Sequence, residues 1–392
     1  MIVTRLVGRG QMLENPVLQD SSLRNGKIRS TGKKVTCMGS EETAVARLER
    51  LVREAESAGA SDVHLHQMGG GAKVQLRLDG VLVAVESLAQ DLAERVFGRI
   101  KFLARLKTYQ DSLPQDGRIA KEDLGTRNDV RVSTYPTITG EKIVLRLFQS
   151  VSVRSLDELG FPAEARGALE VFLRRNGGLL LLTGPAGSGK TTTIYACLRW
   201  LVDHGGRHVI TVEDPVEQVV SEIMQTEVNE AAGLTFAKAS KHLLRQDPEV
   251  LVIGEVRDDE TAQTAVRAAL TGHLVIATLH AGSCQGVIER LLVMCPDRYA
   301  VLSATALVMN QRLMRRICGS CQGKGCAPCC GSGYRGRVPL LEWLMMTDEL
   351  REKIGREGAL GLAPQRTLEQ SAREVWEAGV SDQNEYRRMM GI

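Results

Sequence analysis

The chain has 392 residues, and its shares of hydrophobic (43%) and charged (25%) residues are those of a soluble globular protein. A formal net charge of +3 is too small to indicate a dedicated nucleic-acid binder, so no direct nucleic-acid binding is expected. No apolar stretch is long enough to span a bilayer and no signal-peptide core is present, so we expect a cytosolic protein. Domains of roughly 100 to 200 residues are usual, so this length predicts two or three of them.

Residues 1–40 hold seven Lys or Arg residues against two acidic ones and show little apolar periodicity. This composition predicts a basic flexible arm. We interpret the arm as a solvated tail, with contact to anionic lipid or to an acidic partner as the alternative.

Residues 41–150 are predicted to form a small α+β domain. Apolar side chains at helical spacing indicate a helix over 41–58, and a second helix is expected over 91–107. Asp79-Gly80 is a hairpin signal between two alternating segments. The expected strands are 63–65, 74–78, 81–85, 130–133 and 142–147. Residues 151–161 are interpreted as a linker.

Residues 162–317 are predicted to form an α/β domain that begins with a helix over 162–174. Largely apolar runs alternate with helical segments, which indicates parallel strands buried on both faces. These runs are 179–182, 209–212, 250–253 and 274–279. A ligand site is expected at the carboxyl ends of the strands. Residues 337–392, near the C-terminus, are expected to be helical.

The first of these runs leads into a phosphate-binding loop. The pattern G-x-x-x-x-G-K-[ST] is complete, and its residues with the next one are Gly184, Pro185, Ala186, Gly187, Ser188, Gly189, Lys190, Thr191 and Thr192. Its glycines expose backbone N–H groups to an anion, and the following helix adds its positive end. Lys190 would reach the β- and γ-phosphates of ATP, and Thr191 would offer its hydroxyl to Mg²⁺. The alternative is an ordinary glycine-rich turn.

Two further strands deliver carboxylates. The run 250–253 leads through Gly254 to Glu255, our first choice for organising Mg²⁺-bound water or polarising the attacking water. The run 209–212 leads to Glu213, which is the second candidate. For Glu213 the alternative is an acidic residue at an exposed strand end without a catalytic role.

Histidines flank the last of these apolar runs at His273 and His280. An imidazole at His280 could sense the γ-phosphate or link the site to a neighbouring element. Taken singly, each histidine is better interpreted as a structural group.

Five of the nine cysteines fall between residues 318 and 330. Cys318, Cys321, Cys326 and Cys329 form two C-x-x-C pairs on glycine-rich turns, which suits one tetrahedral Zn²⁺. Each pair begins a C-x-x-C-x-G-x-G unit, and residues 318–336 are predicted to form a compact zinc arm. An iron–sulfur cluster and a redox-active pair are the alternatives, and Cys330 is left over.

Four segments together resemble the Walker A, aspartate, Walker B and histidine boxes of the ATPases that drive type II secretion and type IV pilus assembly. They are residues 183–191, 210–217, 244–258 and 271–280. Segments 60–64, 77–80, 113–118 and 129–147 are similar to the domain that precedes the motor in that family. The resemblance covers nearly the whole chain from about residue 41.

The resemblance implies a RecA-like P-loop NTPase domain after a PAS-like domain, assembled as a homo-hexameric Mg²⁺-dependent ATPase. In that family arginines of the preceding domain close over the nucleotide, and Arg118 and Arg131 match them here. The alternative is that both arginines pair with acids such as Asp116 or Asp129. The paired cysteines favour the assembly or secretion branch over pilus retraction.

The implied partner is a platform protein of the inner membrane, which would hold the ATPase at the inner face of the cell membrane. The implied role is assembly of a pseudopilus, pilus or competence filament. A retraction motor and a non-hydrolysing, nucleotide-gated scaffold are the alternatives. The match departs from the family in three places: the usual N-terminal platform-docking domain is not recognised, the cysteine pairs lie closer together, and residues 281–283 differ.

Overall fold

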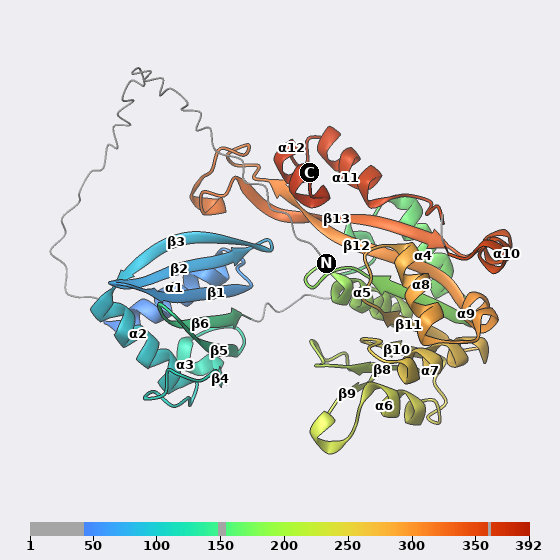
Figure 1. The fold of residues 1–392 in the computed structure, drawn as a ribbon, viewed down its shortest axis with the longest axis horizontal. Helices are drawn as coiled ribbons and strands as arrows, with labels where there is room; N and C mark the ends of the chain where they lie inside the picture. The colour runs from blue at the N-terminus through green and yellow to red at the C-terminus, as the bar shows by residue number, and fades with distance from the viewer. Residues whose placement is uncertain (1–42, 148–153, 360–361) are drawn as a thin grey trace, which may run out of the picture. The chain divides into compact units, whose positions relative to one another are not determined.

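The computed structural model describes residues 43–147, 154–359 and 362–392, which contain a six-stranded and a seven-stranded sheet (Figure 1). The basic arm predicted for residues 1–40 lies outside the described residues, as does the start of the predicted linker. Within the described ranges, no helix combines the length and the apolar character needed to cross a membrane.

The first sheet is antiparallel throughout, with the strand order β3-β2-β1-β6-β5-β4. Its elements are α1 (Ala44–Ser57), β1 (Asp62–Met68), β2 (Gly71–Leu78), β3 (Val81–Ala89), α2 (Gln90–Leu103), β4 (Gln115–Ile119), α3 (Lys121–Leu124), β5 (Val130–Thr137) and β6 (Gly140–Leu147). The α+β character expected of this region is confirmed. Strand β4 was not expected, and the predicted helix 91–107 ends at Leu103.

One face of this sheet is apolar and is covered by α1 and α2. Alternate residues such as Val63, Leu65, Ile143 and Leu145 are fully buried in one core with the apolar stripes of both helices. Alternation along a strand then places the intervening residues on the opposite face. That face carries many of the charged side chains of the sheet.

Charged residues lie in one row across this opposite face. The strand register places them in the order Arg118, Arg131, Arg146, Asp62 and Arg77, on β4, β5, β6, β1 and β2. Asp62 is buried and pairs with Arg146 (Nε to Oδ1, 2.9 Å) and with Arg77 (Nε to Oδ2, 3.4 Å). The row therefore contains one buried acid, Asp62, and four arginines, two of which are adjacent to it.

The second sheet has the order β13-β12-β7-β11-β10-β8-β9, with every neighbouring pair parallel except β12 and β13. Its elements up to β11 are η1 (Asp157–Leu159), α4 (Ala163–Leu173), β7 (Gly178–Thr183), α5 (Lys190–Asp203), β8 (Val209–Glu213), β9 (Met224–Glu227), η2 (Glu230–Ala232), α6 (Phe236–Leu243), β10 (Val250–Ile253), α7 (Asp259–Leu270) and β11 (Leu274–Thr278). The remaining elements are α8 (Cys284–Met294), α9 (Arg298–Ala304), β12 (Thr305–Ile317), η3 (Ala327–Cys329), β13 (Tyr334–Met345), α10 (Asp348–Glu357), α11 (Leu368–Glu377) and α12 (Gln383–Met390).

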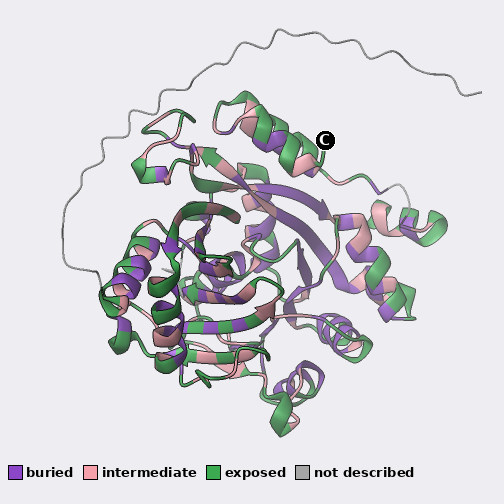
Figure 2. Ribbon diagram, turned by 60° about the vertical axis from the view of Figure 1, so that its left-hand side comes forward, coloured by how far each residue is buried: buried purple, intermediate pink, exposed green. Residues whose placement is uncertain are grey.

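Helices cover both faces of this sheet, as the apolar runs of its strands predicted. Along β7, Leu179 and Leu181 pack into the core formed with α6 to α9, whereas Leu180 and Leu182 pack into the core formed with α4 and α5. Figure 2 shows buried residues along the strands and exposed residues on the outer surfaces of the helices. The carboxyl ends of the parallel strands meet at one edge of this sheet, which is where the site lies.

The expectation of an entirely helical region over 337–392 is wrong for its first part. Strand β13 extends to Met345, pairs with the equally unexpected β12, and places the cysteine cluster in the turn between them. The arginines, glycine and proline of β13 conceal its strand character in the sequence. Pairing with β12 stabilises β13 as a strand even though its local sequence has a low strand propensity.

Candidate active site and cysteine cluster

The phosphate-binding loop connects β7 to α5, in the strand, loop and helix order that the motif requires. Gly189 is the residue before α5 and has a positive φ of 92°, a conformation that favours glycine. The Lys190 ammonium donates to the carbonyl oxygens of Gly184 (2.8 Å) and Pro185 (3.1 Å). Partial burial lowers the pKa of Lys190, and nearby Glu255 opposes this shift. The lysine side chain thus folds over its own loop, where a phosphate would meet it.

Strand β12 supports the loop from behind through Gln311, a buried residue that the sequence analysis missed. The Gln311 Oε1 atom accepts a hydrogen bond from the Thr193 hydroxyl of α5 (2.8 Å). A Cβ atom at Gly189 would lie 2.7 Å from Gln311 Nε2, so a larger residue at 189 would displace this amide. No sequence motif marks Gln311, because its partner lies 118 positions away.

Glu213 is a buried carboxylate, 7% exposed, at the end of β8. It accepts hydrogen bonds from the hydroxyls of Thr211 (2.6 Å) and Tyr195 (2.7 Å) and from the Gln225 side-chain amide (3.1 Å). Three donors hold its oxygens in fixed positions. The alternative for Glu213 was an acidic residue at an exposed strand end, whereas the structure shows this residue buried.

Glu255 has a different environment, since its side chain is 20% exposed and its partners are cationic or titratable. The His280 Nε2 atom lies 2.8 Å from one carboxylate oxygen, and the Arg257 Nε donates to the other at 2.5 Å. Arg257 also donates to Asp214 (3.2 Å), and these hydrogen bonds, that to Glu255 first, raise the pKa of Arg257. The guanidinium therefore joins the acidic ends of two neighbouring strands.

One cavity of about 170 Å³ is lined by side chains from every predicted box, among them Lys190, Thr191, Glu213, Glu255 and His280. Parallel strands bring these residues together because their carboxyl ends meet at one edge of the sheet. The cavity combines a cation, hydroxyls and carboxylates, which are the groups that binding of a metal–triphosphate complex requires.

His273 lies at the opposite end of β11 from His280. Its Nδ1 atom contacts the Ala268 carbonyl (3.0 Å) and the Thr271 hydroxyl (3.1 Å), which fits the structural interpretation of this histidine.

Arg118 and Arg131 lie opposite each other on the antiparallel strands β4 and β5. Arg118 forms an ion pair with Asp129, the pairing considered as an alternative. A backbone hydrogen bond from Lys121 and then Arg118 lower the pKa of the Asp129 carboxyl. Because the Arg118 side chain is 71% exposed, the pair is accessible to solvent, and closure of both arginines over a nucleotide remains a prediction.

The four predicted metal-binding cysteines converge on one point, with all four sulfurs within 4.8 Å of one another. The Sγ–Sγ distances are 3.7 Å for Cys318 and Cys326, 3.8 Å for Cys321 and Cys329, and 3.5 Å for Cys326 and Cys329. Four thiolates placed tetrahedrally at Zn–S distances of about 2.3 Å lie about 3.8 Å apart. The donor set therefore fits a zinc ion.

The two C-x-x-C-x-G-x-G units pack against each other in a symmetrical way. A Cβ atom at Gly333 would lie 2.5 Å from the Gly323 carbonyl oxygen, so only glycine fits the contact. Backbone N–H groups of Cys326 and Gly333 donate to the Cys329 sulfur at 3.2 and 3.3 Å. Although desolvation opposes it, these donors lower the pKa of Cys329 to about 6, which favours the thiolate that a metal requires.

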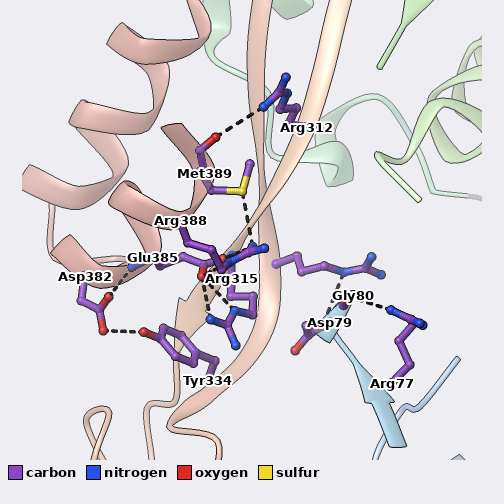
Figure 3. Close-up of polar contacts among 11 residues, drawn as sticks. Arg77, Asp79, Gly80, Arg312, Arg315, Tyr334, Asp382, Glu385, Arg388 and Met389 are labelled. Carbon is purple, nitrogen blue, oxygen red and sulfur yellow. Dashed lines mark hydrogen bonds and ion pairs between the residues drawn. The ribbon is translucent and has the colours of Figure 1, made fainter. Parts of the chain in front are cut away.

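A buried ion-pair cluster anchors the last helices beside the base of the cysteine arm (Figure 3). Glu385 of α12 is 1% exposed and accepts from Arg315 of β12 (2.7 Å) and from Arg388 (2.6 Å). Tyr334 of β13 donates to Asp382 (2.7 Å), and the Arg315 guanidinium lies 4.0 Å from the centre of the Tyr334 ring. The C-terminal helices are thus attached to both strands that carry the cysteines.

The sheet order, the loop between β7 and α5 and the acidic ends of β8 and β10 define a RecA-like P-loop NTPase fold. The profile of the family described as "Type II/IV secretion system protein" matches residues 39–388. The chain belongs to this family, and the resemblance drawn from the sequence motifs is confirmed.

Several relatives carry the description "Type II secretion system protein E". The protein of Dickeya dadantii is 39% identical over 351 residues, which cover 83% of this chain and 70% of the relative. The protein of Klebsiella pneumoniae is 38% identical over 384 residues, covering 90% of this chain and 77% of the relative. The Pseudomonas aeruginosa protein is 39% identical over 346 residues, covering 81% of this chain and 69% of the relative.

Solved structures agree with the fold. The ATPase DotB of Legionella pneumophila has a TM-score of 0.66 at 22% identity, covering 91% of this chain and 98% of that one. The pilus retraction motor PilT, solved with bound ADP, has a TM-score of 0.60 at 27% identity, covering 87% of this chain and 96% of that one.

Proposed function

We propose that this chain is a Mg²⁺-dependent ATPase that works as a homo-hexameric ring and drives assembly of a type II secretion pseudopilus, a type IV pilus or a competence filament. The observation that supports this most strongly is the cavity in which Lys190, Thr191, Glu213, Glu255 and His280 meet. Membership of the secretion family and the relatives' descriptions as type II secretion proteins favour assembly.

Each group in the cavity then has a separate role. The backbone N–H groups of residues 184–191 and the Lys190 ammonium bind the phosphates, while Thr191 offers its hydroxyl to Mg²⁺. Glu255, the more accessible carboxylate, polarises the attacking water, and His280 orients Glu255 through its 2.8 Å contact. Glu213, held by three donors, would serve as a fixed carboxylate that helps to hold the metal or its water.

Two arginines complete the proposed site. Arg118 and Arg131 would reach the transferred phosphoryl group when the region 41–150 closes on the region 162–317. The exposure of Arg118 is consistent with this role, because a side chain in an exposed ion pair can leave its partner at little cost.

We further propose that Cys318, Cys321, Cys326 and Cys329 hold one structural zinc ion, which would cross-link a turn that has little apolar core of its own. The platform protein of the inner membrane is the proposed partner. Contact with it would place the ATPase at the inner face of the membrane.

Phosphate release by the purified chain in MgATP tests the enzymatic proposal. The Lys190→Ala variant should lose at least about 100-fold of the rate, because a cation is removed from the developing charge. Lys73→Ala is the matched control, since Lys73 is an exposed lysine of β2 outside the cavity, and it should retain the rate. Tight ATP binding without turnover in an assembled ring would instead support the scaffold alternative.

Metal analysis tests the cysteine cluster. The wild-type chain should contain one zinc per chain, and the double variant Cys318→Ser and Cys321→Ser should contain none. Cys330→Ser is the matched control and should keep its zinc, because Cys330 is not among the four converging sulfurs. Stoichiometric iron with visible absorbance would show an iron–sulfur centre in place of zinc.

A further inference from the structure

Tyr195 is a buried residue of the helix that follows the phosphate-binding loop, and the proposed mechanism does not yet use it. It is 3% exposed and lies four positions after Thr191, so both residues occupy the same side of α5. Its hydroxyl donates to Glu213 Oε2 at 2.7 Å and accepts from the Gln218 backbone N–H at 3.1 Å. A buried hydroxyl with both capacities satisfied occupies one defined position.

The contact is a polar link between α5 and the end of strand β8, two elements that also share one hydrophobic core. Of the three side chains that donate to Glu213, Thr211 belongs to its own strand and Gln225 to the neighbouring strand β9. Tyr195 alone among these three comes from the helix that carries Lys190 and Thr191. Tyr195 therefore supplies the side-chain hydrogen bond that links the Glu213 carboxylate to the helix of the phosphate-binding residues.

Within this proposed ATPase function, we propose that Tyr195 is a positioning residue that holds Glu213 at the distance from Thr191 at which both can serve one Mg²⁺ ion and its water. Burial and the neighbouring Glu213 raise the pKa of the Tyr195 hydroxyl well above its usual range, so it stays a donor at every physiological pH. A neutral donor fixes the carboxylate without cancelling its charge. A lysine or arginine in this position would cancel it.

The Tyr195→Phe variant tests this inference, since it removes one oxygen and keeps the ring. With the hydroxyl absent, Glu213 keeps its other two donors but loses its link to α5. We expect kcat to fall about 10-fold or more, KM for ATP to stay within about threefold, and the Mg²⁺ concentration for half-maximal rate to rise severalfold. If the hydroxyl had only a structural role, its loss would not lower kcat and raise the Mg²⁺ requirement while leaving KM nearly unchanged.

Tyr334→Phe is the matched control. Its hydroxyl also donates to a carboxylate at 2.7 Å, that of Asp382, and it does not line the cavity. This variant should match the wild type in kcat, KM and Mg²⁺ requirement. Thermal unfolding of both variants shows whether they lose similar stability.

Two results would overturn the inference. One is a Tyr195→Phe variant with wild-type kcat and Mg²⁺ requirement. The other is a loss of kcat that is not specific to the proposed role. Such a loss would occur equally in Tyr334→Phe, or would come with an equal loss of ATP affinity and of folded protein in Tyr195→Phe. In both cases an active wild type leaves the ATPase proposal intact, whereas a wild type without turnover would overturn that proposal together with this inference.

Discussion

The two sheets place their polar residues differently, and the difference follows from strand direction. In the seven-stranded sheet, both faces are buried and the parallel strands collect their polar residues at one edge. In the six-stranded antiparallel sheet, neighbouring strands end at opposite edges, and charged residues lie in a row across the face opposite α1 and α2. The first arrangement suits a compact catalytic cavity, and the second suits a broad cationic surface.

The largest effect should come from the edge of the parallel sheet. Replacing Glu255 with Gln keeps the shape and removes the charge that polarises water, so phosphate release should fall about 1,000-fold while ATP binding persists. Glu222→Gln is the control and should keep its rate, because this exposed acid accepts a hydrogen bond from the neighbouring Ser221 and does not line the cavity. A near-normal rate in Glu255→Gln would contradict the proposal that the edge of the parallel sheet supplies the catalytic carboxylate.

The second effect is on stability and lies at the flank of the parallel sheet. Glu385→Gln leaves Arg315 and Arg388 without their buried carboxylate and should cost about 3 kcal/mol of unfolding free energy, measured by denaturant titration. Although desolvation opposes it, hydrogen bonds from Arg388 and Arg315 lower the pKa of Glu385 to about 2. Its contribution should be complete above about pH 4.5 and disappear as the pH falls towards 2.

Exposed Glu352 pairs with Arg356 within α10 and supplies the control for Glu385. Glu352→Gln should change the unfolding free energy by less than about 0.5 kcal/mol, as is usual for exposed helical pairs. Equal effects of the two substitutions would show that burial of the C-terminal cluster contributes nothing.

The third effect belongs to the antiparallel sheet and depends on pH. Both ring nitrogens of His64 are buried without a hydrogen-bond partner, and desolvation followed by nearby Lys142 and Arg77 lowers its pKa to about 4. Asp62 partly opposes this shift, and Arg146 adds to it. The unfolded chain binds the proton near pH 6.5, so stability should fall as the pH drops from 6.5 towards 4, by about 2 kcal/mol at pH 5.

Unfolding monitored between pH 5 and pH 7 measures this loss. The His64→Gln variant should lose most of the pH dependence in that interval, because glutamine does not titrate. If His64→Gln keeps the full pH dependence of the unfolding free energy, other titratable groups cause that dependence. His204, which is exposed and stacked on Trp200, offers the matched control, and His204→Gln should keep the slope.

The smallest effect should appear in the charged row of the antiparallel sheet. Arg118→Lys keeps the charge but loses the planar fork, so turnover should fall about 10-fold with little change in stability. Arg95→Lys is the control on α2, where Arg95 donates to the Asp91 carbonyl, and it should retain the rate. An unchanged rate in Arg118→Lys would confine the chemistry to the parallel sheet.

The features that could be predicted from the sequence are those that short, contiguous stretches of residues encode. The loop 184–191, the strands that lead to Glu213 and Glu255, and the cysteine spacing are contiguous patterns, and the structure brings these residues together as expected. Gln311 and the hairpin of β12 and β13 escaped prediction because their roles depend on partners distant in sequence. Tyr195 carried one weak signal, since it lies one helical turn beyond Thr191 on the same side of α5.

The path of β12 has a mechanical consequence. Gln311 touches the phosphate-binding loop, and the same strand reaches Ile317, one residue before the first cysteine of the arm. An extended segment of this length spans roughly 20 Å, and its pairing with β13 stiffens it. The register shift between Arg315 and Ile317 is the irregularity in this pairing. A displacement of the arm is therefore either absorbed at that bulge or transmitted along the strand as a lever to the back of the loop.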